Sequence, residues 1–350
     1  MDSSIAAILL QDGVTQGAVY VLIALALVLV FSVTRIIFIP QGEFVAFGAM
    51  TIAALQMNKA PLTALLLLVL GALTFATETA TVLRNPVRRQ RARRDLPVQA
   101  GKYLLYPLAV YGFTMLLAPR TLSPALQVGL TLAIVVPMGP MLYRLVYLPL
   151  ERASVLVLLI ASVALHLALV GLGLLIFGAE GYRSAPLTDA QFAIGTQVIP
   201  GQNLLVLGTA VVAIGALYLY FGRTLSGKAL KATAINSLGA QLVGIGTIQA
   251  GKLALTLAAL IGAVCGVLIG PLTTISYDTG FLIALKGFVG AIFGGLASYP
   301  IAAAGALTVG VLDSFSSFWA SAFKEVIVFT LIIPILIWRS LVSPHSDSDH

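Results

Sequence analysis

The feature that most constrains this chain is a succession of long apolar stretches separated by short polar loops. A membrane-crossing helix needs about twenty predominantly apolar residues, because the hydrocarbon core is about 30 Å thick. Only 9% of the residues are charged and the mean hydropathy is +1.03, whereas a soluble domain carries about 25% charged residues. We therefore predict an all-α polytopic membrane protein whose lipid-facing surface replaces a soluble core.

About eleven spans are expected, short or broken ones included. They cover residues 17–34, 40–56, 61–80, 102–118, 124–145, 153–177, 203–221, 251–270, 283–298, 301–320 and 325–341. Alternating these spans gathers most basic residues on one side of the membrane: Arg35, the six arginines from Arg84 to Arg94, Arg144, Arg152, those of residues 222–247 and Arg339. The other side receives only Lys59, Arg120, Arg183 and Lys324. The positive-inside rule then predicts an N-terminus outside and a cytoplasmic C-terminus.

The longest polar interval in the second half is residues 222–247, GRTLSGKALKATAINSLGAQLVGIGT. It carries Arg223, Lys228 and Lys231 and no acid. Alanine and leucine at 229–234, and apolar residues at 240–245, predict two short helices that end near Gly244 and Gly246. An exposed short helix with an apolar side suits a groove in another protein. The alternative is an ordinary cytoplasmic loop held inside by its charge.

The sequence motif G-x-x-L-K-A-T-A followed by A-x-L-V-G-I resembles the coupling loop of the permease subunits of branched-chain amino acid ABC importers. The resemblance continues through residues 252–270 and 284–314. In that family the loop presses a short helix into a cytoplasmic ATPase. The resemblance therefore implies a coupling role for Arg223, Lys228, Lys231, Ala232, Ala234, Ala240 and Gly244. Ser237-Leu238-Gly239 stand where the family usually has an acidic residue, so this loop departs from the family there.

A second candidate site follows the first span, at Pro40-Gln41-Gly42-Glu43. Gly42 and Glu43 match the family pattern asparagine-phenylalanine-alanine-histidine-glycine-glutamate, and Pro40 and Gln41 depart from it. Pro40 and Gly42 interrupt the helix, and an ionisable residue at a membrane edge indicates function. The alternative is an acid at a helix N-terminus, stabilised by the helix dipole.

Lys286 lies beside Gly287, Gly290, Gly294 and Gly295, whose spacing predicts close helix packing. Residues 286–295 loosely repeat the pattern of residues 41–50, which favours an inverted repeat with a central site, with chance similarity as the alternative. The predicted substrate pathway comprises Gln41, Gly42, Glu43, Lys286, Gly287 and Gly290. Asp313 and Glu325 are interpreted as interface acids near Lys324.

The resemblance lapses over residues 57–123 and resumes at 143–152, which predicts an inserted helical hairpin within a single domain, residues 1–350. The hairpin loop, with arginines from Arg84 to Arg94, is predicted to anchor topology and touch anionic lipid; a docking surface beside the ATPases is the alternative. The resemblance implies that residues 222–250 form the cytoplasmic coupling loop, and residues 342–350 are predicted to form a polar tail. The outer loop carries FAIGTQVIPG, which predicts a short strand pair.

His166, in the span 153–177, is interpreted as a packing residue or an interhelical hydrogen bond, with a proton relay as the alternative. Cys265 lies in an apolar span as a small packing residue, so no disulfide framework or metal cluster is expected. No catalytic residue, metal or cofactor is predicted. The basic residues behind the net charge of +7 lie in loops at the membrane ends, so they do not indicate nucleic-acid binding.

The leading hypothesis is a transmembrane permease subunit of an ABC importer in a bacterial inner membrane, moving a small polar solute inward. No P-loop is present, so the chain is expected to be no enzyme. The resemblance implies cytoplasmic ATP-binding subunits, a second permease subunit and a periplasmic or extracellular solute-binding protein. A branched-chain or related amino acid is favoured, with urea and aromatic acids left open. The alternative is an autonomous secondary transporter or channel that uses Glu43, His166 and Lys286. An intramembrane enzyme has little support.

Overall fold

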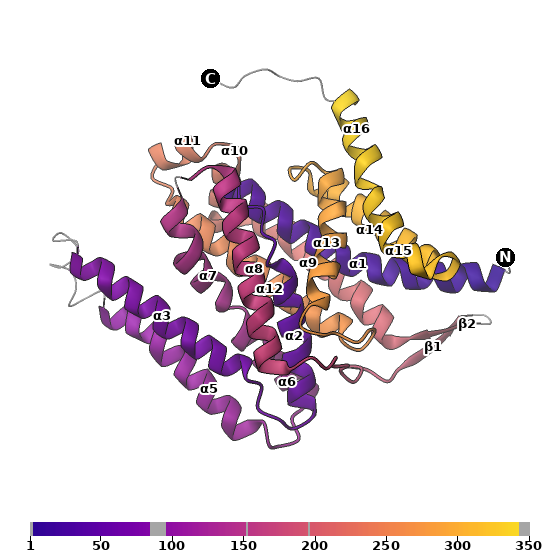
Figure 1. Cartoon of the computed structure of the whole chain (residues 1–350), viewed down its shortest axis with the longest axis horizontal. Helices are drawn as coiled ribbons and strands as arrows, with labels where there is room; N and C mark the ends of the chain where they lie inside the picture. Colours follow the sequence, from indigo (N-terminus) through magenta and orange to yellow (C-terminus); the bar gives the residue numbers. More distant parts are fainter. Residues whose placement is uncertain (1–2, 85–95, 152, 195–196, 343–350) are drawn as a thin grey trace.

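The computed structural model describes residues 3–84, 96–151, 153–194 and 197–342. Of the described residues, 80% are helical, which confirms the predicted all-α class, and α1 (Ser3–Thr34) runs through the middle of the molecule (Figure 1). The predicted basic cluster from 85 to 94, Arg152 and residues 343–350 of the polar tail lie outside the described residues.

Seven of the predicted spans overlap helices long and apolar enough to cross a membrane, and the first of these helices begins well before the predicted start at residue 17. These are Ser4–Thr34, Thr63–Arg84, Pro124–Leu150, Val155–Phe177, Gly201–Arg223, Thr247–Ile269 and Tyr299–Trp319. They correspond to α1, α3, the run α6 to η3, α8, α9, α12 and α14. The run comprises α6 (Pro124–Val135), α7 (Met138–Leu142), a π-helical turn η2 (Tyr143–Tyr147) and η3 (Leu148–Leu150).

The other four predicted spans are short or broken in the structure. Residues 40–56 form α2 (Gln41–Gln56) and residues 283–298 overlap α13 (Thr279–Phe293). Residues 102–118 form a π-helical turn, η1 (Gly101–Leu105), followed by α5 (Tyr106–Leu117). The last span divides into α15 (Lys324–Thr330) and α16 (Ile332–Val342), preceded by the short turn η4 (Ser321–Phe323). A span count of eleven therefore stays a prediction.

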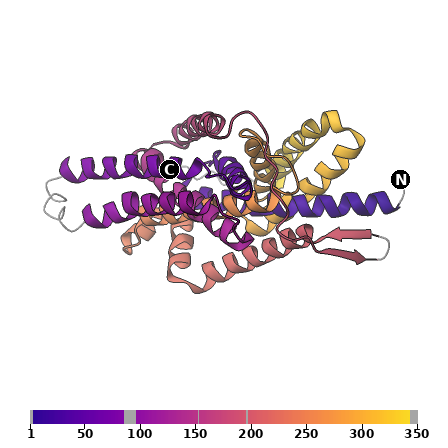
Figure 2. The same cartoon turned by 90° about the horizontal axis from the view of Figure 1, so that it is seen from below.

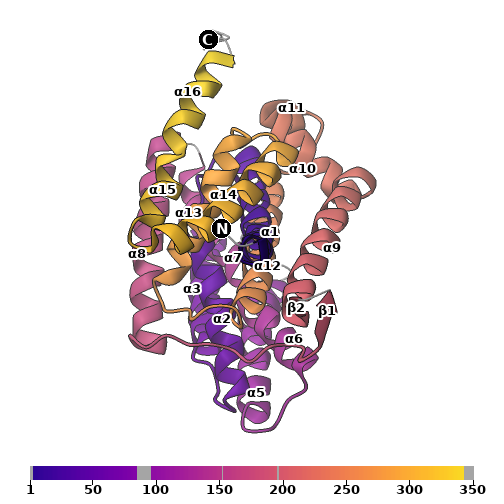
Figure 3. The same ribbon diagram turned by 90° about the vertical axis from the view of Figure 1, so that its right-hand side faces the viewer.

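The core forms where α12, α13 and α14 pack around α1, which Figure 3 shows nearly end-on. Small residues allow the backbones of these helices to approach one another closely. The backbone of Gly17 in α1 lies directly against Gly310 of α14, and Val45 of α2 lies directly against Gly266 of α12. A methyl group at either Gly310 or Gly266 would overlap the facing backbone. Close backbone approach replaces large side chains at these crossings.

The helices α3 and α5 form a hairpin that projects to one side of the molecule (Figures 1 and 2). This hairpin matches the predicted helical pair, and α3 also contacts α6 and α7. The predicted strand pair is confirmed: β1 (Gln191–Ile194) and β2 (Gln197–Pro200) pair antiparallel, with Gln191 opposite Pro200. In Figure 1 these strands lie at the opposite end of the molecule from α10 (Leu225–Ile235) and α11 (Ser237–Leu242).

Candidate functional site

The two short helices predicted in residues 222–247 exist, and polar caps fix where each begins. The Thr224 hydroxyl accepts a hydrogen bond from the backbone N–H of Gly227 at 2.9 Å, at the start of α10. The Asn236 side chain accepts one from the N–H of Gly239 at 2.8 Å, at the start of α11. Such caps each stabilise a helix by about 1 kcal/mol. Gly244, with a φ of 85°, follows the end of α11 in a conformation that favours glycine.

The inner face of α10 and α11 packs against this chain's own helices. Leu230 is buried among Leu29 and Val33 of α1 and Ala254 of α12. Ala240 is buried as well, and Ala232 and Ala234 are half-buried. The predicted contact alanines therefore lie against the chain or beside it, on the side of α10 and α11 that packs with Leu230.

The outer face of α10 and α11 carries larger apolar side chains, all more than half exposed. They are Leu225, Ile235, Leu238, Leu242 and Val243. Arg223, Lys228 and Lys231 are exposed beside them, as is Gly244. The sequence identified the cations and two of these apolar residues. The capping residues Thr224 and Asn236 were the signal in the sequence that could have located the start of each helix.

The predicted acid Glu43 lies in the first turn of α2 and is only 1% exposed. Its Oε1 is 2.7 Å from Nδ1 of His166, which comes from α8. Gln41 donates from Nε2 to the carbonyl oxygen of Ala258 in α12 at 3.0 Å. The second oxygens, Glu43 Oε2 and Gln41 Oε1, are buried without a hydrogen-bond partner among the described residues. The predicted interhelical hydrogen bond of His166 is thus present, and it joins the two candidate residues.

The helices α2 and α13 begin at the same place in the molecule. Gly42 and Gly280 lie so close that a methyl group on either would overlap the backbone carbonyl oxygen of the other. Two helix N-termini, each with a partial positive charge, therefore meet beside Glu43. One residue further along α13, the Phe281 ring lies 4.6 Å from the His166 ring. This arrangement also fits the simpler reading of Glu43 as an acid stabilised by the helix dipole.

An apolar cavity of about 300 Å³ lies next to this pair. It is lined by Leu27, Ile37, Phe38, Ile39, Leu159, Phe281, Ala284, Leu285 and Phe288. Phe281 belongs to both the cavity wall and the contact with His166. Small-molecule sites start at about 300 Å³ and combine apolar walls with a few polar groups. The volume and the wall suit the hydrocarbon part of a small solute.

Lys286 is buried in an ion-pair network of its own, which does not include Glu43 or His166. Its Nζ lies 3.0 Å from Asp313 Oδ1 and 3.2 Å from Glu325 Oε1. The Tyr20 hydroxyl donates to the other oxygen of Asp313 at 3.0 Å. The interpretation of Asp313 as an interface acid is wrong, because it is buried against Lys286. Glu325 does lie 3.9 Å from Lys324, as expected, and it also pairs with Lys286.

The two pathway glycines on α13 serve packing in this structure. Gly287 lies against Ile23 of α1 and Gly290 lies against Ala306 of α14. The predicted close approach through small residues is present at both positions. Cys265 is buried, as expected of a packing residue.

Several long apolar helices, two short helices that meet at their N-termini and charged side chains paired inside the bundle define a polytopic membrane protein. The family model of the branched-chain amino acid transport system permease component matches residues 101–336. The chain belongs to this family. The matched residues begin in η1, inside the hairpin and earlier than the motif at 143–152, and they leave out the segment around Gln41 to Glu43.

Three relatives show how far the likeness extends. The high-affinity branched-chain amino acid transport system permease protein LivH of Salmonella typhimurium is 28% identical over 201 residues, 55% of this chain and 65% of the relative. The permease protein BraD of Pseudomonas aeruginosa is 29% identical, over 57% of this chain and 68% of BraD. A probable LivH of Methanocaldococcus jannaschii is 28% identical, over 62% and 73%. The chain thus spans just under two-thirds of the length of the Salmonella relative. No solved structure matches the chain.

Proposed function

We propose that the chain is the membrane-spanning permease of an ABC importer, which moves a branched-chain or related amino acid inward while separate subunits hydrolyse ATP. The outer face of α10 and α11 carries this proposal. That face presents large apolar residues and three cations on a capped pair of helices at one end of the molecule.

The chemistry of this face defines the partner that fits it. Leu225 and Leu242 are 87% and 82% exposed, and covering a leucine side chain stabilises by about 1.5–3 kcal/mol. Lys228 and Lys231 lie exposed on α10 without a carboxylate partner among the described residues. A complementary surface is therefore an apolar groove rimmed by acids, which we assign to a cytoplasmic ATP-binding subunit.

The remaining partners and the orientation follow from that assignment. If α10 and α11 face the cytoplasm, the β1–β2 end faces outward, where a periplasmic or extracellular solute-binding protein would dock. The N-terminus is then outside, in a bacterial inner membrane, and a second permease subunit completes the membrane part. The family likeness and the charge distribution support this arrangement.

For the solute pathway we propose the region where α2 and α13 meet. The buried Glu43 carboxylate, with Oε2 unpartnered, suits the ammonium group of an amino acid. The adjacent apolar cavity suits a branched hydrocarbon side chain. Gln41 offers a second free acceptor, and Gly42 permits the close crossing. Lys286, with Gly287 and Gly290, holds α13 in place instead of binding the solute carboxylate, because two carboxylates already neutralise its charge.

The docking surface is tested by charge reversal with a matched control. Lys228→Glu/Lys231→Glu is compared with Lys59→Glu/Arg120→Glu, two exposed cations in the loops that flank α3 and α5. We expect the first variant to insert normally and to lose the ATP-binding subunits on purification in mild detergent, while the control keeps them. Retention of those subunits by both variants would contradict the assignment of this face.

A further inference from the structure

Two π-helical turns face each other where the α3–α5 hairpin meets the rest of the molecule. The turn η1 carries Lys102 and Tyr103, and η2 carries Arg144. Arg144 donates from Nη1 to the Tyr103 hydroxyl at 2.9 Å, and its guanidinium carbon lies 5.7 Å from the centre of the Tyr103 ring. Helix α3 contacts both turns. Single π-helical turns are rare and recur at functional sites. This junction is therefore a candidate ligand site.

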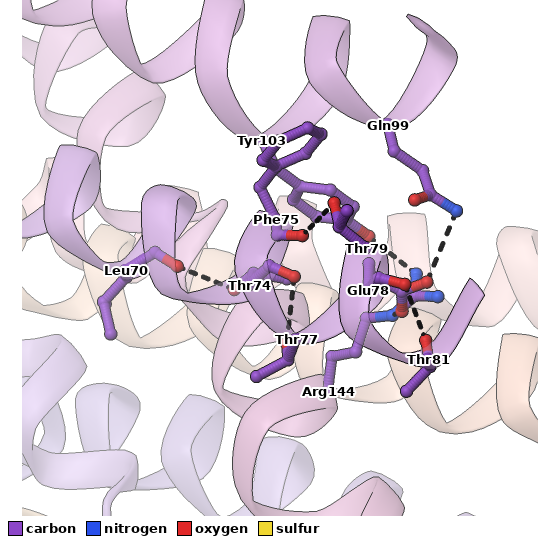
Figure 4. Close-up of polar contacts among 10 residues, drawn as sticks. All are labelled: Leu70, Thr74, Phe75, Thr77, Glu78, Thr79, Thr81, Gln99, Tyr103 and Arg144. Atoms are coloured by element: carbon purple, nitrogen blue, oxygen red, sulfur yellow. Dashed lines mark hydrogen bonds and ion pairs between the residues drawn. The ribbon is translucent and has the colours of Figure 1, made fainter. Parts of the chain in front are cut away.

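Among the described residues at the junction, the acid Glu78 has a partner for each of its two carboxylate oxygens. Glu78 of α3 is buried and contacts the Arg144 guanidinium. Gln99 donates from Nε2 to the other oxygen of Glu78 at 3.3 Å. Figure 4 shows Gln99, Tyr103 and Arg144 gathered around Glu78 from different elements. Glu78 therefore neutralises Arg144 and is satisfied without further cations.

Two more cations at the junction lack such a partner. Lys252, in the second turn of α12, is half-buried. The preceding residue, Gly251, lies against the Tyr143 ring of η2, next to Arg144 in the chain, and α12 contacts η2. Neither Lys252 nor Lys102 pairs with a carboxylate among the described residues. Among the described residues, Lys102 and Lys252 thus add two positive charges that Glu78 does not neutralise. Lys252 is half-buried whereas Lys102 is exposed, and an unpaired half-buried charge costs free energy unless an anion offsets it.

We propose that this junction binds the phosphate group of an anionic membrane lipid, held by Lys102 and Lys252 beside Arg144. Lysine and arginine are the side chains that bind phosphate oxygens by charge-assisted hydrogen bonds. Lys252 lies near the start of its long helix and Arg144 near the end of its own, which is the depth of lipid headgroups.

Apolar surface beside Lys102 favours a lipid over a free phosphate ion. Directly after Lys102, the hairpin exposes Leu104, Leu105 and Leu108. Acyl chains can cover these residues while the headgroup lies at the lysines. The bound lipid would then join the hairpin to α12 and screen the repulsion between them. This role is independent of the importer function proposed above.

The test is lipid retention, measured by native mass spectrometry after equilibration with phosphatidylglycerol or phosphatidylcholine. We expect wild-type protein to retain phosphatidylglycerol preferentially. Lys102→Gln/Lys252→Gln should weaken that retention about thirtyfold, from two basic residues near an anionic surface. Lys102→Arg/Lys252→Arg should retain it, and so should the matched control Lys228→Gln/Lys231→Gln, which removes the same charge from α10.

Three results would overturn the proposal. The first is equal retention of both lipids by the wild type, which needs no variant and so does not depend on folding. The second is unchanged retention by a Lys102→Gln/Lys252→Gln protein that elutes as a single species. The third concerns the source of the phosphate: millimolar inorganic phosphate, added without phosphatidylglycerol, would raise the melting temperature of the wild type but not of that variant. This last result would assign the junction to a free anion.

Discussion

Neutralising Asp313 should destabilise the protein, because the buried ammonium group of Lys286 loses one of its two carboxylate partners. Asp313→Asn keeps the size of the side chain and an acceptor for Tyr20, but it removes one of the two carboxylates on Lys286. Removing one partner of a buried ion pair costs about 3–5 kcal/mol. Glu325 remains 3.2 Å from Lys286, so we expect a loss near the lower end, about 3 kcal/mol.

Two further variants separate the buried charge from the side chains themselves. Glu325→Gln should cost about 1 kcal/mol or less, because the Glu325 side chain is 34% exposed and exposed pairs contribute little. Lys286→Met/Asp313→Asn should cost less than Asp313→Asn alone, because the buried cation is removed together with its buried carboxylate.

The measurement is unfolding of the purified protein in mixed micelles, followed by circular dichroism as denaturing detergent is added. A double-mutant cycle gives the coupling energy between Lys286 and Asp313. If the double variant loses as much stability as the sum of the single variants, the two residues are not coupled and the network does not hold α13 as described.

The remaining predictions concern the glycine crossing, the outer face of α11 and the acid at α2. Gly42→Ala should destabilise by about 1–3 kcal/mol through overpacking against α13, whereas Gly215→Ala, with open space around it, should stabilise slightly; melting temperatures of both variants check this. Leu242→Ser should leave melting unchanged, since the side chain is exposed, and weaken binding of the ATP-binding subunits by about tenfold or more; titration of those subunits onto immobilised permease measures it. Glu43→Gln should preserve folding and abolish uptake of the amino acid, because the neutral amide no longer attracts an ammonium group; initial uptake rates in proteoliposomes decide this, and normal uptake would remove Glu43 from the pathway.

Hydropathy was sufficient to predict the class of this fold and seven of its spans, because a lipid-facing helix must be apolar along its whole length. The short helices were harder, since α2 and α13 are buried by neighbouring helices and carry no distinct length signal. The meeting of Gly42 with Gly280 is a contact between residues far apart in the chain, and nothing local to either glycine encodes it.

The sequence identified the unusual ionisable side chains better than it predicted which residues they contact. The sequence selected Glu43, His166 and Lys286 as unusual because ionisable groups inside a membrane are costly. It did not pair Glu43 with His166, nor Lys286 with Asp313, because those pairs depend on how α8 and α14 rotate against their neighbours. The Glu78–Arg144 contact was missed for the same reason: both residues lie near predicted helix ends, where charge is ordinary.

The central claim, that this chain is an ATP-driven importer subunit, is tested most directly by uptake into proteoliposomes. The chain is purified with whatever subunits accompany it, and uptake of radiolabelled leucine is measured with the solute-binding protein outside and ATP either present or absent inside. We expect uptake only with ATP, competed by valine and isoleucine and unaffected by collapse of the proton gradient. Uptake by the chain alone, without ATP and abolished by that collapse, would contradict the account and identify a secondary transporter.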